Sequence, residues 1–153
     1  MERARLAGTL LAEACRGLPG VELGIIGFTD DTIYLAGNAD QCAVHALEAG
    51  GGNNDAAALA HAAAAARESR RRSKLLLMIS DGFPTECSVK SLEHLVASLT
   101  KEGIRCAQVA VGPLETVSFP HHVVFTDSDL GVAIPDFGRA VANLVSQTLR
   151  STS

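Results

Sequence analysis

The sequence has no tryptophan, and aromatic residues make up only 4% of its 153 residues. Hydrophobic residues still reach 47% and charged residues 20%. A core must therefore be built from small and aliphatic side chains, mainly Ala, Val, Leu and Ile. Because this length is typical of one domain, we expect residues 1–153 to form a single domain.

Close cysteine pairs and long apolar runs are also missing. The four cysteines are scattered without any C-x-x-C pair, which argues against a zinc or dithiol motif. No apolar stretch is long enough to cross a bilayer, and Met1 is followed at once by charged residues rather than by the apolar run of a signal peptide. We therefore expect a cytoplasmic protein without membrane contact.

Positive charge is not in excess either, since the formal net charge is −4. A nucleic acid is thus a poor candidate for a partner. The one basic cluster is formed by Arg67 and residues 70–72. We expect this cluster at the end of a helix, where cations are favoured by the negative pole of the helix dipole.

Apolar periodicity divides the chain into alternating helices and strands. Such alternation predicts an α/β fold, a Rossmann-like three-layer sandwich with a mostly parallel sheet and helices on both faces. The predicted helices cover residues 2–16, 53–72, 91–101 and 135–149, with a short helix near 44–47, and the predicted strands cover residues 21–28, 32–36, 74–80, 104–111 and 122–125.

Two polar segments are placed where open parallel sheets bind ligands, beyond the carboxyl ends of the strands. Asp81 directly follows the apolar strand at residues 74–80, and Asn53, Asn54 and Asp55 follow a run of three glycines before a helix. Their oxygens could bind a hard cation such as Mg²⁺. The alternative is local, because Asp-Gly is a common turn and Asn and Asp are good helix N-caps.

Residues 51–86, GGNNDAAALAHAAAAARESRRRSKLLLMISDGFPTE, resemble the second half of a von Willebrand factor A (vWA) domain. The form N-x-D-A-A-A-L, then a helix, then K-L-L-L-M-I-S-D-G-x-P, is similar to cobalt-chelatase T-type subunits and nitric oxide reductase activation proteins. VELGIIGFTDDTIYLAG resembles the family's second and third strands, the third antiparallel at the sheet edge. VAVGP and VVFTDSD resemble its last two strands.

The resemblance implies a metal-ion-dependent adhesion site that holds Mg²⁺ or Mn²⁺ and docks an acidic residue of a partner protein. It also implies work beside a MoxR-type AAA+ ATPase. The implied metal ligands are Asn53, Asp55 and Asp81, and the implied partner-binding residues are Asn54, Gly82, Phe83, Thr85 and Glu86.

The sequence departs from the family before its first helix, where the family has a strand and a D-x-S-x-S motif that supplies metal ligands. Neither is found here, so we interpret the chain as N-terminally truncated relative to the family. The missing strand would be the central one, which leaves unpaired backbone groups on both sides. The neighbouring strands could close up, another chain could fill the place, or the protein could be unstable.

Three functions follow from these observations. The first is a non-enzymatic protein-interaction module of the vWA type that binds its partner through Mg²⁺. The second is a metal-free, degenerate vWA scaffold or homo-oligomer. The third is a doubly wound hydrolase or phosphotransfer domain that uses Asp81, although the Gly-rich loop lacks the G-K-[S/T] ending of a phosphate-binding loop.

Overall fold

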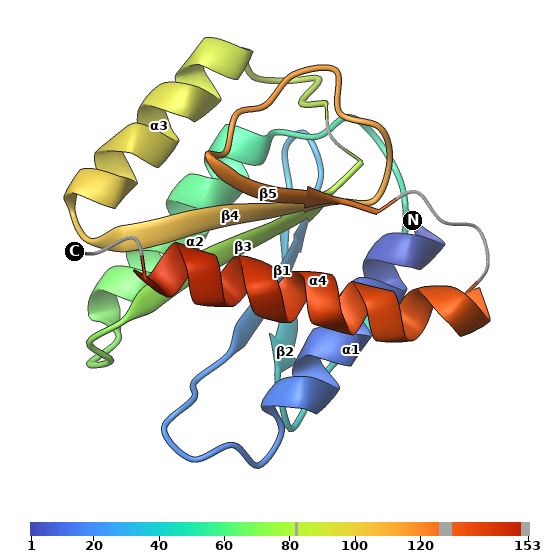
Figure 1. Cartoon of the computed structure of the whole chain (residues 1–153). Helices are drawn as coiled ribbons and strands as arrows, with labels where there is room; N and C mark the ends of the chain where they lie inside the picture. Colours follow the sequence, from blue (N-terminus) through green and yellow to red (C-terminus); the bar gives the residue numbers. More distant parts are fainter. Residues whose placement is uncertain (82, 126–129, 151–153) are drawn as a thin grey trace.

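A computed structural model describes residues 1–81, 83–125 and 130–150 (Figure 1). Helices and strands alternate along the chain, as the periodicity predicts. The elements in chain order are α1 (Glu2–Cys15), β1 (Gly24–Phe28), β2 (Ile33–Asn38), the 3₁₀ helix η1 (Val44–Ala46), α2 (Asp55–Glu68), β3 (Lys74–Ser80), α3 (Val89–Lys101), β4 (Ile104–Ala110), β5 (His121–Val124) and α4 (Leu130–Arg150).

The strands form two separate sheets. One is the antiparallel hairpin of β1 and β2, and the other is a parallel sheet in the order β3-β4-β5. β3 and β4 pair over their whole length, from Lys74 opposite Ile104 to Ser80 opposite Ala110. Within the described residues, β1 and β3 are not hydrogen-bonded to each other. The predicted α/β fold is therefore confirmed, and β1 and β3, the two strands for which closing up was one expected outcome, have not closed up.

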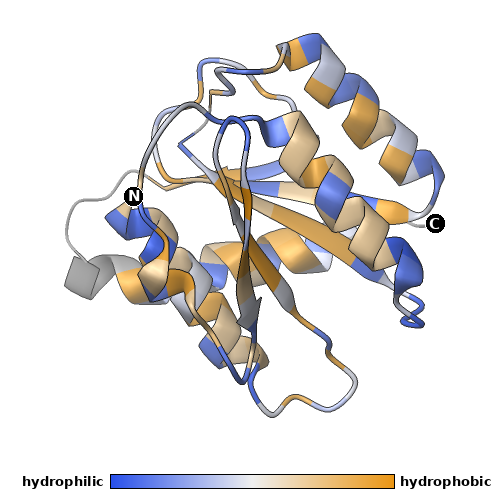
Figure 2. Cartoon of the chain, turned by 180° about the vertical axis from the view of Figure 1, so that it is seen from behind, coloured by the Kyte–Doolittle hydropathy of each residue, from blue (hydrophilic) through white to orange (hydrophobic). Residues whose placement is uncertain are grey.

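Helices cover both faces of the parallel sheet (Figures 1 and 2). On one face, α1 and α4 pack on the odd-numbered side chains of β4, such as Ala107 and Val109. On the other face, α2 and α3 pack on Met78, Ile104 and Cys106. Figure 2 shows the strands between these layers coloured mostly as hydrophobic, which is typical of strands covered on both faces.

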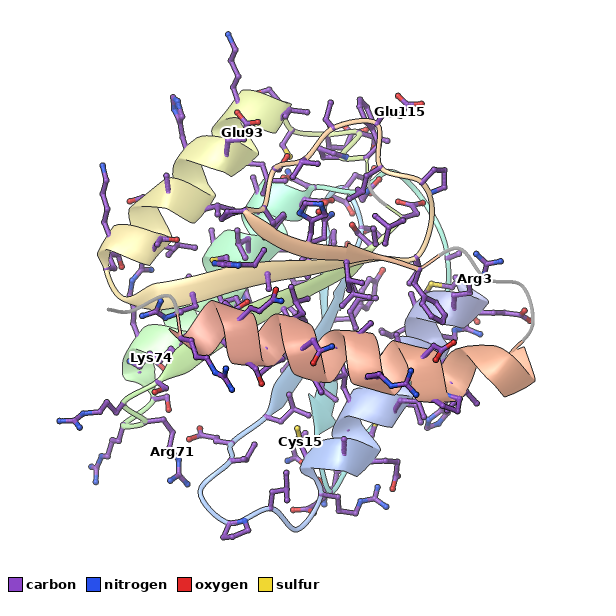
Figure 3. The ribbon with its side chains drawn as sticks, viewed as in Figure 1. Arg3, Cys15, Arg71, Lys74, Glu93 and Glu115 are labelled. Atoms are coloured by element: carbon purple, nitrogen blue, oxygen red, sulfur yellow. The ribbon has the colours of Figure 1, made fainter. Side chains whose placement is uncertain are left out.

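Two predicted helix boundaries are wrong. Helix α2 ends at Glu68 rather than at residue 72, because the chain must reverse within five residues to enter β3 and Ser69 is already extended. Residues 70–72 therefore follow the helix, and Arg71 points away from the body of the molecule (Figure 3). Helix α4 begins at Leu130 instead of residue 135, and Pro135 is accommodated inside it with the loss of one helical hydrogen bond.

The other elements agree with the prediction to within a few residues. β1 is shorter than predicted, since residues 21–23 remain outside it, and β2 extends to Asn38. No helix in the described part of the chain has the length and apolar character needed to cross a membrane.

Candidate functional site

The candidate site lies where three segments meet, at the carboxyl ends of β1 and β3 and the N-terminus of α2. Thr29 directly follows β1, and its carbonyl accepts a hydrogen bond from the backbone N–H of Asn54, 3.2 Å away. Asp81 directly follows β3 and is close enough to Asp55, the first residue of α2, to affect its ionisation. The polar segments that the sequence places at strand ends are thus brought together.

Asn53 ties the start of α2 to the loop after β3. Its side-chain Nδ2 donates to the carbonyl of Phe83 at 2.9 Å and to Oδ1 of Asp55 at 3.1 Å. Its backbone N–H donates to Oγ1 of Thr85 at 2.8 Å, and the Thr85 hydroxyl in turn donates to Oδ1 of Asn53 at 3.3 Å. The backbone N–H groups of Thr85 and Glu86 both donate to the Asn53 carbonyl, each at 3.1 Å. Asn53 therefore fixes residues 83–86 against the helix.

Two of the three glycines before Asn53, Gly51 and Gly52, allow this close approach. A Cβ atom on Gly52 would lie 2.5 Å from Oγ1 of Thr85 and 2.7 Å from Oε1 of Glu86. Gly51 has a φ of 64°, and a Cβ there would lie 2.7 Å from Oδ1 of Asp30. The Gly-rich run thus allows the loop to pack tightly between the ends of β1 and β3.

Asp55 is the unusual residue of the site, because its carboxylate is fully buried, with 0% of the residue exposed. Oδ1 accepts from Asn53, whereas Oδ2 is buried and has no hydrogen-bond partner among the described residues. Burial raises the pKa of Asp55 to about 6; the hydrogen bond from Asn53 opposes this rise, and the negative charge of Asp81 adds to it. A buried carboxylate beside a second acid and without a compensating charge is costly unless a cation or proton joins it.

The donor set of this site fits a hard, hydrated cation. Asp55 offers the unpartnered Oδ2, and Asp81 is exposed at the same corner. Mg²⁺ commonly binds one or two carboxylates and keeps several waters. In the described ranges, no group of three or more His, Cys, Asp or Glu side chains is placed to hold a metal, so protein ligands alone would not complete a coordination shell.

The predicted partner-binding residues lie partly on α2 and partly on the loop after β3. Asn54 caps α2, since its Oδ1 accepts from the N–H of Ala57 at 3.1 Å. Phe83, Thr85 and Glu86 lie in exposed positions on the loop held by Asn53, and Phe83 is 50% exposed. Gly82 lies outside the described residues.

Sequence reasoning missed one polar contact near the site. Gln108 of β4 is buried, and its Nε2 donates to Oγ of the buried Ser80 at 3.0 Å, while its Oε1 has no partner in the part of the chain that the structure describes. The available signal was a single amide inside the apolar strand IRCAQVA. This contact engages the Ser80 hydroxyl and holds the end of β3 against β4.

By sequence, no protein-family model and no curated protein matches the chain. Solved structures do match it. The SpRpn10 VWA domain has a TM-score of 0.64 at 14% identity, covering 95% of this chain and 81% of that one. The conserved hypothetical protein BatB from Bacteroides thetaiotaomicron has a TM-score of 0.59 at 14% identity, covering 94% and 89%. Manganese-loaded TRAP from Plasmodium vivax has a TM-score of 0.56 at 14% identity, covering 90% and 64%.

The fold therefore defines a class: this chain has the α/β architecture of a vWA domain. At 14% identity the similarity shows the fold alone. The fold does not distinguish the cobalt-chelatase subgroup, which residues 51–86 resemble in sequence, from other vWA domains.

Proposed function

We propose that the chain is a non-enzymatic protein-interaction module that binds a divalent cation, Mg²⁺ or Mn²⁺, at the corner formed by Asp55 and Asp81. The observation that carries this proposal is the buried, unpartnered Oδ2 of Asp55 next to the second acid. A bound cation would stabilise both carboxylates in their ionised form. Water ligands would complete its coordination shell, and one of them could be exchanged for a partner's carboxylate.

In this proposal Asn53 acts mainly as a clamp and not as a metal ligand, in contrast to the role that the resemblance implies. Both groups of its side chain are engaged, with Nδ2 on Asp55 and Phe83 and Oδ1 facing Thr85. Asn53 would then orient the Asp55 carboxylate and hold residues 83–86 at the edge of the site. The exposed Phe83, together with Asn54, Thr85 and Glu86, would contact the bound partner.

Thermal unfolding with Mg²⁺ or Mn²⁺, compared with EDTA, tests the metal site. A ligand that binds only the folded state stabilises it by about 1.4 kcal/mol when its free concentration is tenfold above Kd, which corresponds to a rise in Tm of a few degrees. We expect such a rise for the wild type and its loss in Asp81→Ala. The matched control is Asp40→Ala, because Asp40 is an exposed acid in the turn after β2.

The same experiment separates the proposal from its alternatives. A cooperatively folded wild type whose Tm is identical in Mg²⁺, Mn²⁺ and EDTA would refute the metal site and favour the metal-free scaffold or homo-oligomer. A hydrolase or phosphotransfer domain would instead require turnover that depends on Asp81. The Ser80 hydroxyl beside Asp81 is buried against Gln108 and would not serve as a nucleophile in this third function.

The partner is proposed from the sequence resemblance of residues 51–86 to chelatase and reductase-activation proteins. We propose a MoxR-type AAA+ ATPase that presents an acidic residue to the cation. Binding of the two purified proteins should require Mg²⁺ and should be lost in EDTA. Equal binding in both buffers would exclude docking through the metal.

A further inference from the structure

An acidic pocket lies next to the candidate site, between the turn that joins β1 to β2 and the Gly-rich loop before α2. The pocket is open and has a volume of about 320 Å³. Its charged residues are Asp30, Asp31 and Glu48, which are all exposed, and no basic residue is among the described residues that line it. Tyr34, 46% exposed, lines it as well. The pocket therefore gathers negative charge around one aromatic ring.

The three carboxylates of this pocket lack a cationic partner. Asp30 accepts from the backbone N–H of Asp31, and Asp31 accepts from the hydroxyl of Thr32, but within the described ranges none of the three acids forms an ion pair. In the same ranges, no three acids are placed to hold one metal ion. A guanidinium group suits such a spread of carboxylates, because it offers five N–H donors in one plane and stacks on aromatic rings.

Guanidinium groups are exposed at the opposite end of α2, in the turn before β3. Arg70, Arg71 and Arg72 follow one another there, and Figure 3 shows Arg71 pointing away from the body of the molecule. Nε of Arg71 lies 3.7 Å from Oε2 of Glu22, and both side chains are more than half exposed, so this pair is weak and exchangeable. Arg70 and Arg72 form no ion pair with any described residue. The turn thus presents three arginines to other molecules.

The acidic pocket and the arginine turn cannot meet within one chain. Gly51 of the pocket lies before α2, whereas the turn follows Glu68 at its end. A helix of 14 residues is about 20 Å long, so the two surfaces lie at opposite ends of the molecule (Figure 1). A second copy, however, can bring its arginine turn to the pocket of the first. Because the two surfaces differ, such a contact is head to tail, and each added copy leaves one pocket and one turn unoccupied.

We propose that copies of this chain associate head to tail, with the arginine turn of one copy, residues 70–72, inserted into the acidic pocket of the next. The occupant is a second copy because one and the same chain carries both complementary charges. This proposal does not rest on the proposed metal site, since none of the three pocket acids is a proposed metal ligand. Its test is therefore done in EDTA.

Sedimentation velocity over a series of protein concentrations measures the association. At low salt, the mean sedimentation coefficient of the wild type should rise with concentration. In 1 M NaCl the Debye length is only about 3 Å, so the rise should disappear. The folded state should be unaffected by either condition in circular dichroism, because the charges involved are all exposed.

Two complementary variants test which surfaces meet. The pocket variant carries Asp30→Asn, Asp31→Asn and Glu48→Gln, and the turn variant carries glutamine at residues 70–72. Each variant alone should associate at least tenfold more weakly than the wild type, because it loses up to three ion pairs. An equal mixture should recover association as a 1:1 dimer. That dimer should grow no further, because its remaining pocket and its remaining turn are both neutralised.

The matched control neutralises three exposed acids outside the pocket, by Asp40→Asn, Glu93→Gln and Glu115→Gln. It changes the net charge as the pocket variant does and should associate like the wild type. A wild type that stays monomeric at low salt would overturn the proposal, even if its pocket binds an arginine-rich peptide, because the occupant would then belong to another protein. Association that survives in either variant, or that the mixture does not recover, would also overturn it.

Discussion

The two neighbouring strands β3 and β4 differ in a way that their sequences alone do not suggest. KLLLMIS of β3 is more apolar than IRCAQVA of β4, yet most of β3 is half-buried whereas all of β4 except Arg105 is buried. β4 has a paired strand on each edge and helices on each face, while β3, among the residues that the structure describes, has a paired strand on one edge only. The burial of a strand therefore depends on the strands and helices that pack around it. The hydrophobicity of its sequence indicates only that such neighbours are needed.

The largest predicted effect compares the same truncation on both strands. Ile104→Ala in β4 should cost about 3–4 kcal/mol of unfolding free energy, because Ile104 is buried in the core beneath α2 and α3 and the cavity cannot collapse. Ile79→Ala in β3 should cost only about 1–2 kcal/mol, because Ile79 is half-buried and solvent can fill the space. Urea unfolding in EDTA measures both. Equal costs would show that the open edge of β3 is already covered.

A second prediction concerns Asp55, the buried acid next to the end of β3. The folded-state pKa of Asp55, about 6, lies above its unfolded value, so the folded state holds this proton more tightly. Without metal, stability should therefore fall as the pH rises from about 4 to 6, and the loss should be complete above the folded pKa. The loss is about 3 kcal/mol at most.

Asp55→Asn should remove this dependence. Without metal, the variant should match the wild type below about pH 4 and exceed its stability at pH 7, because no buried charge remains. Urea unfolding across this pH range in EDTA makes the comparison, with the exposed Asp40→Asn as the control. A wild-type pH profile parallel to that of Asp55→Asn would mean that Asp55 titrates normally and that the argument for a cation is lost.

The difference between β3 and β4 also explains which structural features could be predicted from the sequence. The strand at residues 74–80 is predicted to the residue, because an apolar run ending in Asp-Gly is a purely local signal. The end of α2 depends on how the chain turns into β3, and no local propensity distinguishes Glu68 from residue 72. The open edge of β3 could not be predicted from the sequence, which left open whether the neighbouring strands close up, another chain fills the place or the protein is unstable, because the pairing of strands is decided by tertiary contacts.

In the candidate site, too, local features are predictable from the sequence and long-range contacts are not. Asp55 and Asp81 are recognisable at a helix start and a strand end, so their positions are predictable from local pattern. The burial of Asp55 is not, because an Asp in the first turn of a helix is normally a solvated residue stabilised by the helix dipole. Here the loop at residues 83–86 arrives from some 30 positions away and is fixed by Asn53. Through Asn53, that long-range contact is linked to the Asp55 carboxylate, which local sequence does not reveal.

The smallest predicted effect tests this clamp. Asn53→Ala removes the side-chain bonds to Phe83, Thr85 and Asp55, and should cost about 1–2 kcal/mol because each such bond contributes about 1 kcal/mol or less after losses to solvent. Hydrogen exchange at the N–H groups of Thr85 and Glu86 should quicken, while exchange in β4 stays slow. The matched control is Asn54→Ala, which removes a helix cap of similar energy on the same helix.

The two asparagines should differ in what they loosen. Asn54→Ala should destabilise α2 without freeing residues 83–86, because Asn54 makes its side-chain bond to Ala57 of its own helix. Asn53→Ala should free that loop and leave the Asp55 carboxylate without its only hydrogen-bond donor among the described side chains. The pKa of Asp55 should then rise further, since the bond from Asn53 lowers it. Unchanged hydrogen exchange of residues 83–86 in Asn53→Ala would show that this loop is held by its backbone hydrogen bonds alone. The loop would then be more rigid than its exposed residues suggest.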